Sequence, residues 1–200
     1  MARLVPKIGY NYVMSEEFLK KVVDNQGEIH TPFWVISDTH FGHNNIIKYC
    51  NRPEDHDRLM FQGWRETVGH RDVILHMGDV LLRKTEFAER IRKLPGQKFL
   101  LKGNHDRLGK NFYKEMGFTF IQEFSINHKG YKVHFTHKPL EELVEDKVIN
   151  VHGHIHQKLM GDRRFLNLSV EQTNYKPVAI IEVLNERIQE LNRKLSEKYL

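Results

Sequence analysis

The chain has 200 residues, of which 40% are hydrophobic and 28% charged, and it carries a formal net charge of +5. This balance is ordinary for a globular domain, and no apolar run approaches the roughly 18 residues that a membrane span needs. The N-terminal residues lack the pattern of a secretory signal, and the single cysteine, Cys50, excludes an internal disulfide, so we expect a cytoplasmic protein.

Charge and histidine content point to an anionic partner or a metal. The isoelectric point is about 9.2, and a basic surplus suits a phosphate, a nucleotide or a nucleic acid. The sequence has no long basic run of the kind that forms a nucleic-acid arm. The 13 histidines are more unusual, because neutral imidazole is a good metal ligand and exchanges protons near neutral pH.

The first half of the chain predicts alternating strands and helices. Residues 1–32 form an N-terminal extension, in which Ser15 is placed to cap a short helix. Apolar residues at helical spacing occupy 55–68 and 84–94. Short apolar runs, each followed by a polar cluster, occur at 33–37, 72–77 and 98–101, and two more follow in the second half at 131–135 and 147–151. The order of strand, helix and strand predicts an α/β fold with a partly parallel sheet.

The second half is richer in predicted β-structure. The expected elements are a hairpin (120–126 and 131–135 around the turn 127–130) and strands at 163–170 and 178–183. Residues 184–200 predict an amphipathic helix that packs on its own domain. We therefore expect one domain over residues 1–200, with the catalytic core at residues 33–183. The N-terminal extension and the C-terminal helix are both candidates for self-association.

Side chains that bind metals follow five of the predicted strands. They are Asp38 with His40, Asp79, Asn104 with His105 and Asp106, His137, and His154 with His156. Proteins of the α/β class place their ligands at the carboxyl ends of strands, and a one-residue spacer lets two side chains point the same way from an extended chain. Carboxylate, imidazole and amide ligands without a thiolate suit Mn, Fe, Zn, Co or Ni. Asp79 is a candidate bridge between two ions that would clamp a phosphate.

Five short blocks in a fixed order give the chain a family resemblance. The blocks are Asp-Thr-His (38–40), Gly-Asp (78–79), Gly-Asn-His-Asp (103–106), His137 and Gly-His-Ile-His (153–156). In this order they resemble the calcineurin-like metallophosphoesterase family, and they span most of the chain. The segment 37–53 is also similar to small bacterial and phage members described only as predicted phosphoesterases. The resemblance implies a four-layer α/β/β/α sandwich, with two mixed β-sheets flanked by helices.

The resemblance also implies a role for each residue of the blocks. The first metal would be held by Asp38, His40 and His156, the second by Asn104, His137 and His154, and Asp79 would bridge them. His105 would be the general acid at the leaving oxygen, and Asp106 would orient its ring. A hydroxide that bridges two divalent ions would attack phosphorus in line. Mn is the ion expected first, with Fe, Zn, Co or Ni as alternatives.

Other histidines and arginines lie outside this ligand set. The candidate substrate contacts are His43, Arg52, Arg83 and Arg107, which lie in or beside the loops of the blocks. His76 lies inside an apolar run and is expected to be a satisfied core residue, and His152 is expected to support the fold. The histidines expected to be structural or exposed are His30, His56, His70 and His128.

Three classes of function are compatible with the sequence. The first is a phosphoesterase acting on a diester of nucleotide or nucleic-acid type, which the basic charge favours, or alternatively on a phosphomonoester. The second is a non-catalytic metal-binding scaffold of the same fold, which should show a broken block, whereas all five blocks are intact. The third is a metal store, which only the histidine count supports. No membrane partner is expected.

Overall fold

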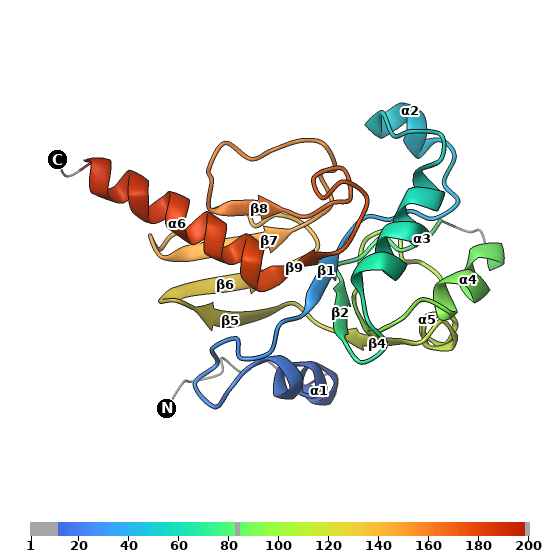
Figure 1. Cartoon of the computed structure of the whole chain (residues 1–200), viewed down its shortest axis with the longest axis horizontal. Coiled ribbons are helices and arrows are strands. Elements are labelled where there is room, and N and C mark those ends of the chain that lie inside the picture. Colours follow the sequence, from blue (N-terminus) through green and yellow to red (C-terminus); the bar gives the residue numbers. More distant parts are fainter. Residues whose placement is uncertain (1–11, 83–84, 199–200) are drawn as a thin grey trace.

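The chain folds into two β-sheets with helices around them (Figure 1). The structure is a computed structural model that describes residues 12–82 and 85–198. One sheet has five strands in the order β4-β3-β2-β1-β9, and the other has four strands in the order β5-β6-β7-β8. Each sheet contains parallel and antiparallel pairs. The predicted arrangement of two mixed sheets flanked by helices is therefore confirmed.

The five-stranded sheet leads into the first three blocks of predicted ligands. Its strands are β1 (Trp34–Ile36), β2 (Val73–His76), β3 (Gln97–Leu101), β4 (Phe118–Ile121) and β9 (Val178–Ala179). The first four run parallel to one another, and β9 pairs antiparallel with β1. The carboxyl ends of β1, β2 and β3 consequently lie at the same edge.

The four-stranded sheet leads into the last two blocks. Its strands are β5 (Phe124–His128), β6 (Tyr131–Phe135), β7 (Val148–His152) and β8 (Phe165–Asn167). β5 and β6 form an antiparallel hairpin, whereas β6, β7 and β8 run parallel. The carboxyl ends of β6 and β7 thus bring His137 and the 153–156 block to one edge.

The central strands divide the hydrophobic core into two clusters. In β2, Val73 and Leu75 belong to the inner cluster between the sheets, whereas Ile74 belongs to the outer cluster under the helices. The inner cluster also contains Val133 and Val151 of the four-stranded sheet. Because both faces of β2 are covered, its first three residues, Val73–Leu75, are all apolar instead of alternating with polar residues.

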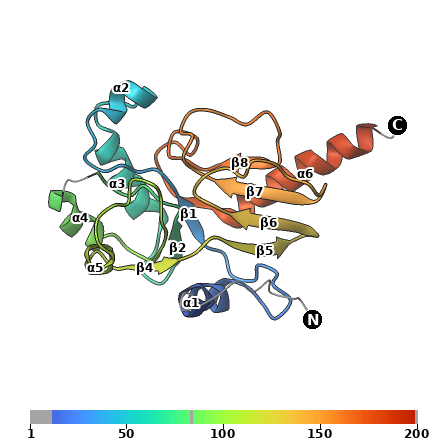
Figure 2. The ribbon, with the colours of Figure 1, turned by 180° about the vertical axis from the view of Figure 1, so that it is seen from behind.

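Helices cover the outer face of the five-stranded sheet and the sides of the sandwich. They are α1 (Tyr12–Val22), α2 (Ile46–Cys50), α3 (His56–Thr67), α4 (Ala88–Arg92) after a 3-10 turn (Thr85–Phe87), α5 (Lys110–Glu115) and α6 (Ile180–Lys198). α3, α4 and α5 lie on the side of that sheet facing away from the four-stranded sheet, and Figure 2 shows the same arrangement from behind. α1 and α6 contribute Phe18 and Leu184 to the inner cluster. Within the described residues, no helix is long and apolar enough to cross a membrane.

The C-terminal helix begins earlier than predicted. The run 178–183 is a strand only through Ala179 and continues as α6 from Ile180. Ile180, Leu184 and Ile188 recur every four positions and are buried in the inner cluster, which is the pattern of one helix face. Helical packing therefore overrides the β-propensity of this run.

Two further predictions differ from the structure, and one helix was not predicted. The run 120–126 is divided between β4 and β5, which belong to different sheets, so only β5 and β6 form the hairpin. Ser15 lies inside α1 instead of at its start. The unpredicted helix is α5, a single short segment after the 103–106 block.

Candidate metal centre

Five strand ends bring the predicted ligands together at one edge of the sandwich. Three of these ends belong to the five-stranded sheet and two to the four-stranded sheet. Backbone hydrogen bonds join the loops that follow them. The N–H of Asp38 donates to the Gly78 carbonyl at 3.0 Å, and the N–H of Gly153 donates to the His137 carbonyl at 3.0 Å. Blocks that are far apart in the sequence thus form one cluster.

The first ligand group consists of Asp38, His40 and His156. Each offers a ligand atom within 4.8 Å of the other two. Asp38 and His40 are buried, and His156 is half-buried. Asp38 is held through Oδ2, which accepts hydrogen bonds from Ser37 Oγ at 2.6 Å and from the backbone N–H of His154 at 2.9 Å. The carboxylate is therefore fixed at Oδ2, while Oδ1 has no hydrogen-bond partner among the described residues.

The second ligand group consists of Asp79, His137 and His154, whose ligand atoms also lie within 4.8 Å of one another. Asn104 joins them, since its Oδ1 accepts a hydrogen bond from His137 Nε2 at 2.9 Å. Asp79 Oδ2 lies 3.5 Å from His137 Nε2 and 3.5 Å from His40 Nε2 of the first group. Asp79 thus stands between the two groups, where a bridging carboxylate is needed.

Buried atoms without hydrogen bonds make the first group a candidate cation site. Within residues 12–82 and 85–198, Asp38 Oδ1 and both ring nitrogens of His40 are buried and have no hydrogen-bond partner. Such atoms are unfavourable unless a ligand satisfies them. Burial raises the pKa of Asp38 and lowers the pKa of His40 well below its usual value. His40 is therefore neutral, which is the form that binds metals, and the donor set fits a divalent transition metal.

His137 and Asp79 form a charged pair in the second group. Burial lowers the pKa of His137, but the hydrogen bond and charge of Asp79 together with Asp38 outweigh burial and raise that pKa to about 9. Burial acts to raise the pKa of Asp79, but His137 and His40 hold it below its usual range. His137 Nδ1 donates to the Met77 carbonyl at 2.9 Å. An ion in this group would therefore replace the proton on Nε2.

Five of the seven predicted metal ligands have a left-handed backbone. Their φ angles are 57° for Asp38, 47° for His40, 58° for Asp79, 70° for His154 and 52° for His156. Residues other than glycine adopt this conformation only where the surrounding structure enforces it, at a cost of roughly 1–3 kcal/mol each. The prediction that an extended chain aims each pair of ligands is therefore wrong, because left-handed turns after the strands aim them.

Two glycines allow the loops to approach this closely. A Cβ atom at Gly103 would lie 2.2 Å from Asp79 Oδ1, and a Cβ atom at Gly153 would lie 2.2 Å from Asp38 Oδ2. Both distances are far shorter than van der Waals contact. A larger residue at either position would push a carboxylate away from the ligand groups.

His105 lies beside both groups, where a general acid was predicted. Its backbone N–H donates to Asp79 Oδ1 at 2.7 Å, and its ring centroid lies 5.5 Å from that of His40. The residue is half-buried, so its ring remains accessible to a substrate. A half-buried imidazole at this place is suited to exchange a proton with a reacting group.

Asp106 does not orient the His105 ring as predicted. Asp106 is 0% exposed. Its Oδ2 accepts hydrogen bonds from the backbone N–H groups of Asp79 and Gly103, both at 2.8 Å, and its Oδ1 accepts one from Val80 at 2.9 Å. Both carboxylate oxygens are thus occupied by backbone amides. Asp106 instead fastens the loop after β2 to the loop after β3.

Of the predicted substrate contacts, His43 and Arg107 remain candidates for that role, and Arg83 cannot be placed. His43 lies beside the first group, with its ring centroid 5.8 Å from that of His40. Arg107 is exposed, and its Nε donates to the Asn104 carbonyl at 3.1 Å. Arg83 lies outside the described residues.

Arg52 is buried and bonded within the chain, which contradicts the predicted contact with substrate. Its side chain is 0% exposed. The guanidinium donates to the Asp38 carbonyl at 2.7 Å, to the Thr39 carbonyl at 2.8 Å and, through Nε, to Glu171 Oε1 at 2.8 Å. We therefore assign Arg52 a positioning role behind the first group.

Glu171 is a site residue that sequence reasoning missed. Its side chain is 5% exposed, and Oε1 accepts a hydrogen bond from His156 Nδ1 at 3.0 Å. With Cys50, these two residues form a third group of potential ligand atoms within 4.8 Å. A metal there is disfavoured, because the Arg52 cation already contacts Glu171 and burial raises the pKa of the Cys50 thiol to about 11.

His76 is a satisfied core histidine, as predicted. Its Nδ1 accepts a hydrogen bond from the Gly78 N–H at 3.2 Å, and its Nε2 lies 3.0 Å from Thr39 Oγ1. Burial lowers the pKa of His76 to about 3, so the ring is neutral and supports the loop without binding an ion. His152 is also fully buried, and its Nδ1 donates to the Gly153 carbonyl at 2.9 Å.

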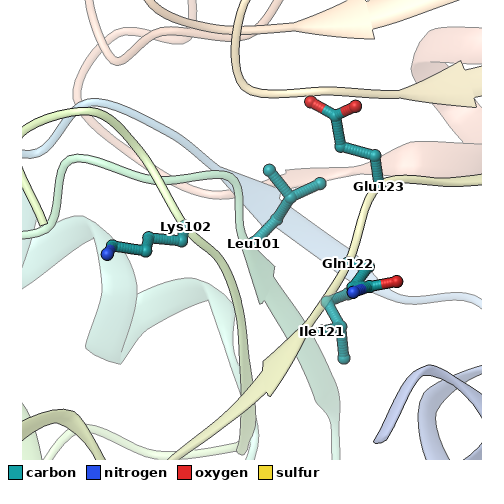
Figure 3. A pocket seen from close by; sticks show the side chains of 5 residues that line it. All are labelled: Leu101, Lys102, Ile121, Gln122 and Glu123. Carbon is teal, nitrogen blue, oxygen red and sulfur yellow. The ribbon is translucent and has the colours of Figure 1, made fainter. Parts of the chain in front are cut away.

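A pocket adjoins the second ligand group. It has a volume of about 480 Å³ and is lined by Leu101, Lys102, Ile121, Gln122 and Glu123. Figure 3 shows Lys102 and Glu123 on opposite sides of Leu101. Lys102 directly precedes the 103–106 block, and Glu123 accepts a hydrogen bond from the backbone of His137. The pocket thus lies beside the loops that carry Asn104 and His137, with one cationic and one anionic residue in its lining.

Comparison with known proteins agrees with this geometry. The family model for calcineurin-like phosphoesterases matches residues 31–194. The chain is 34% identical over 163 residues to the uncharacterized protein MJ1445 of Methanocaldococcus jannaschii, covering 74% of this chain and 86% of that protein. It is 32% identical over 80 residues to the Gene 66 protein of Mycobacterium phage L5, covering 36% of this chain and 39% of that protein. Among solved structures, it is similar to the protein of unknown function AQ665 from Aquifex aeolicus, with a TM-score of 0.63, 25% identity, and coverage of 78% of this chain and 99% of that chain.

The chain belongs to the calcineurin-like phosphoesterase family. This confirms the resemblance that the five blocks indicate. All seven predicted metal ligands lie in or beside the two ligand groups that the structure forms.

Proposed function

We propose that this protein is a phosphoesterase with two divalent metal ions and that it hydrolyses a phosphate diester of nucleotide or nucleic-acid type. The observation that carries the proposal is the pair of ligand groups with Asp79 between them and His105 beside them. Membership of the calcineurin-like phosphoesterase family supports the same class of reaction.

Each residue of the cluster has a chemical role in this proposal. The first ion would be held by Asp38, His40 and His156, the second by Asn104, His137 and His154, with Asp79 shared. Two bound ions neutralise phosphate charge and lower the pKa of a water molecule. The accessible ring of His105 is placed to give a proton to the leaving oxygen. Asp106 keeps the loops that carry Asp79 and His105 at a fixed separation.

Exposed cations around the cluster favour an anionic substrate that extends beyond one phosphate. Lys102 precedes the 103–106 block, Arg107 follows it, and Lys138 follows His137, and all three cations are exposed. With the net charge of +5, they attract a polyanion to this edge of the protein. We propose Mn as the working ion, with Fe, Zn, Co or Ni as alternatives.

Hydrolysis of bis(p-nitrophenyl) phosphate and of p-nitrophenyl phosphate tests the proposal. The full chain is stripped with a chelator and reloaded with Mn²⁺, and we expect the diester to be hydrolysed faster. Faster hydrolysis of the monoester would favour the alternative of a phosphomonoesterase. Two bound ions without hydrolysis of either ester, with each of the five metals, would favour the non-catalytic scaffold.

His105→Ala separates catalysis from metal binding. Because His105 contacts Asp79 through its backbone and not its ring, the variant should still bind two ions. Its kcat for the diester should fall about 10²–10⁴-fold, the usual contribution of a general acid. Unchanged activity in the variant would remove the general-acid assignment.

A further inference from the structure

The loop that follows β8 approaches the metal centre although none of the five blocks lies in it. We call residues 167–172 the support loop. It leaves the four-stranded sheet and crosses to the end of β1, where Ser169 pairs with Ser37 in a parallel bridge. The N–H of Val170 donates to the Ser37 carbonyl at 3.1 Å. The support loop is thus a sixth strand end at the edge that carries the ligands.

The support loop contacts one member of the first ligand group, Asp38, through a serine. Ser169 is 0% exposed, and its Oγ lies 3.0 Å from Asp38 Oδ2. The Oγ of Ser169 also lies 2.8 Å from Asn167 Oδ1, which in turn accepts from the Ser169 N–H at 3.0 Å. The serine is therefore held in place at the oxygen through which Asp38 is fixed.

The support loop contacts a second member of that group, His156, at two points. The amides of Asn167 and Gln172 donate to the His156 carbonyl at 2.7 and 3.0 Å. The Glu171 carboxylate accepts from His156 Nδ1 at 3.0 Å. Since Nδ1 carries the proton for this bond, Nε2 is the nitrogen left for an ion, as in other carboxylate–histidine–metal arrangements.

Arg52 connects Glu171 to the backbone of the loop after β1. Glu171 is bound by the buried Arg52 guanidinium, with Nη2 at 2.7 Å, and the same guanidinium donates to the carbonyls of Asp38 and Thr39. Rotation of Glu171 away from His156 would leave a buried cation without its carboxylate. The second group has partners of its own, namely the Met77 carbonyl and Asn104 at His137, and it meets the network through the His154 N–H, which donates to Asp38 Oδ2.

We propose that Glu171, with Ser169 and Asn167, is a positioning element that sets the affinity and geometry of the first metal site and affects the second site far less. The inference rests on the proposed function only in taking two divalent ions as the ligands. It adds that the two sites are unequal, because one loop outside the five blocks supports only the first.

Calorimetric titration of the stripped full chain with Mn²⁺ tests the proposal without measuring activity. Glu171→Ala should weaken one of the two sites about 10–100-fold and leave the other within about twofold. Glu171→Gln should lie between Glu171→Ala and wild type, because its amide oxygen still accepts from Nδ1 but has no charge. The matched control is Glu182→Gln, an exposed carboxylate on α6, which should leave both affinities unchanged. Ser169→Ala, which removes the contact to Asp38, should weaken the same site as Glu171→Ala.

Several results would overturn the proposal. They are an equal loss at both sites, unchanged affinities in Glu171→Ala, or a wild-type chain that binds fewer than two ions. Circular dichroism and the melting temperature of each metal-free variant separate unfolding from loss of one site, and if Glu171→Ala does not fold, Glu171→Gln and Ser169→Ala decide. Failure of the proposed function looks different, since a chain could show unequal sites and still hydrolyse no phosphate ester.

A different observation, an exposed aromatic ring, carries a second inference. Tyr49 on α2 is 68% exposed, and it is the aromatic residue among the large apolar side chains that are exposed in the described chain. Its ring centroid lies 6.3 Å from that of His43, which lies 5.8 Å from that of His40. Tyr49 is therefore two ring contacts away from the first ligand group.

The position of Tyr49 is fixed from both sides. Ile46 and Cys50 anchor α2 in the interior, and Gln157, just after the 153–156 block, donates to the Tyr49 carbonyl at 3.5 Å. An accessible ring held at the edge of a phosphate site offers a stacking surface for a base. We infer that Tyr49 stacks on a base next to the phosphate that is cleaved, which makes single-stranded nucleic acid or a dinucleotide the substrate class. This inference deepens the proposed function and rests on it.

Fluorescence anisotropy in a chelator measures this contact without hydrolysis. The probes are a labelled oligothymidylate and an abasic oligonucleotide of the same length. Tyr49→Ala should weaken oligothymidylate binding about 5–150-fold, which corresponds to roughly 1–3 kcal/mol for one stacked base, and should weaken abasic binding far less. Tyr49→Phe, which keeps an aromatic ring, should recover most of the oligothymidylate affinity that Tyr49→Ala loses. Three results would overturn the inference: equal losses of affinity on both probes, a Tyr49→Phe variant that binds as weakly as Tyr49→Ala, or a wild-type protein that binds the two probes equally or not at all. Failure of the proposed function would appear differently, as an absence of diester hydrolysis.

Discussion

The charge of His137 gives metal binding a pH dependence that can be calculated. In the metal-free protein the pKa of His137 is about 9, because Asp79 and Asp38 outweigh the effect of burial. An ion in the second group must displace the Nε2 proton. Burial lowers the pKa of His154, so that ring is already neutral above pH 7, and Asp79 is already ionised. The proton on His137 is therefore the one that competes with the ion between pH 7 and 9.

The expected magnitude follows from the distance between the working pH and this pKa. Each pH unit well below 9 lowers the apparent affinity of the second site about tenfold, so the affinity should rise about fiftyfold from pH 7 to pH 9 and level off above pH 9 at about a hundredfold over its value at pH 7. Calorimetric titration with Mn²⁺ at half-unit steps of pH measures the change. Repeating it in buffers with different ionisation enthalpies counts the protons released.

A variant of the titrating residue provides the control. His137→Gln replaces the imidazole with an amide, whose oxygen can still contact an ion but which has no group that titrates near pH 9. It should release about one proton fewer than wild type on binding the second ion, although its affinity is lower. A wild-type affinity that stays flat between pH 7 and 9, or a variant that releases as many protons as wild type, would refute the assigned protonation of His137.

Three further predictions concern the loops and the metal-free state. Gly153→Ala should abolish the first site, because its Cβ would lie 2.2 Å from Asp38 Oδ2. The control is Gly161→Ala, whose Cβ meets nothing within 4 Å and which should bind two ions as wild type does. Equal metal contents in the two variants would contradict this steric argument. Asp106→Ala should lower the free energy of unfolding by about 3 kcal/mol or more, since three buried N–H groups lose their acceptor, and an unchanged urea midpoint would show that they find others. The melting temperature of chelator-treated protein should fall as the pH rises from about 6.5 to 9. The pKa of His137 is raised in the folded protein, so the charged ring stabilises the fold fully below the ordinary histidine pKa, and this stability is lost as the pH rises through the folded-state pKa of about 9. A melting temperature that rises over this window would contradict the raised pKa.

The gathering of the candidate ligand side chains was predictable because it depends on local sequence at strand ends. An apolar run followed by Asp, His or Asn with a nearby glycine predicts both a buried strand and a polar residue at its carboxyl end. Parallel pairing then brings such ends together, as it does for Asp38 and Asp79 through β1 and β2. The left-handed backbone of these residues was not predictable, because it follows from contacts between loops that are distant in sequence.

Residues that act through long-range contacts left no local signal. Glu171 reaches His156 and Arg52 only because the support loop crosses from one sheet to the other. The burial of Arg52 depends on the same crossing, so an arginine next to a phosphate-binding loop was predicted to bind substrate. The early start of α6 was visible in the spacing of Ile180, Leu184 and Ile188, but the run of β-branched residues before it favoured a strand.

Each ligand group takes residues from both sheets. Asp38 and Asp79 follow strands of the five-stranded sheet, whereas His137 and His156 follow strands of the four-stranded sheet. An ion bound between them would link the two sheets at an edge where polar loops replace apolar packing. Because an ion bound only by the folded state adds about 2.7 kcal/mol at a hundredfold excess over its Kd, metal supply would govern how long the folded protein survives as well as whether it is active.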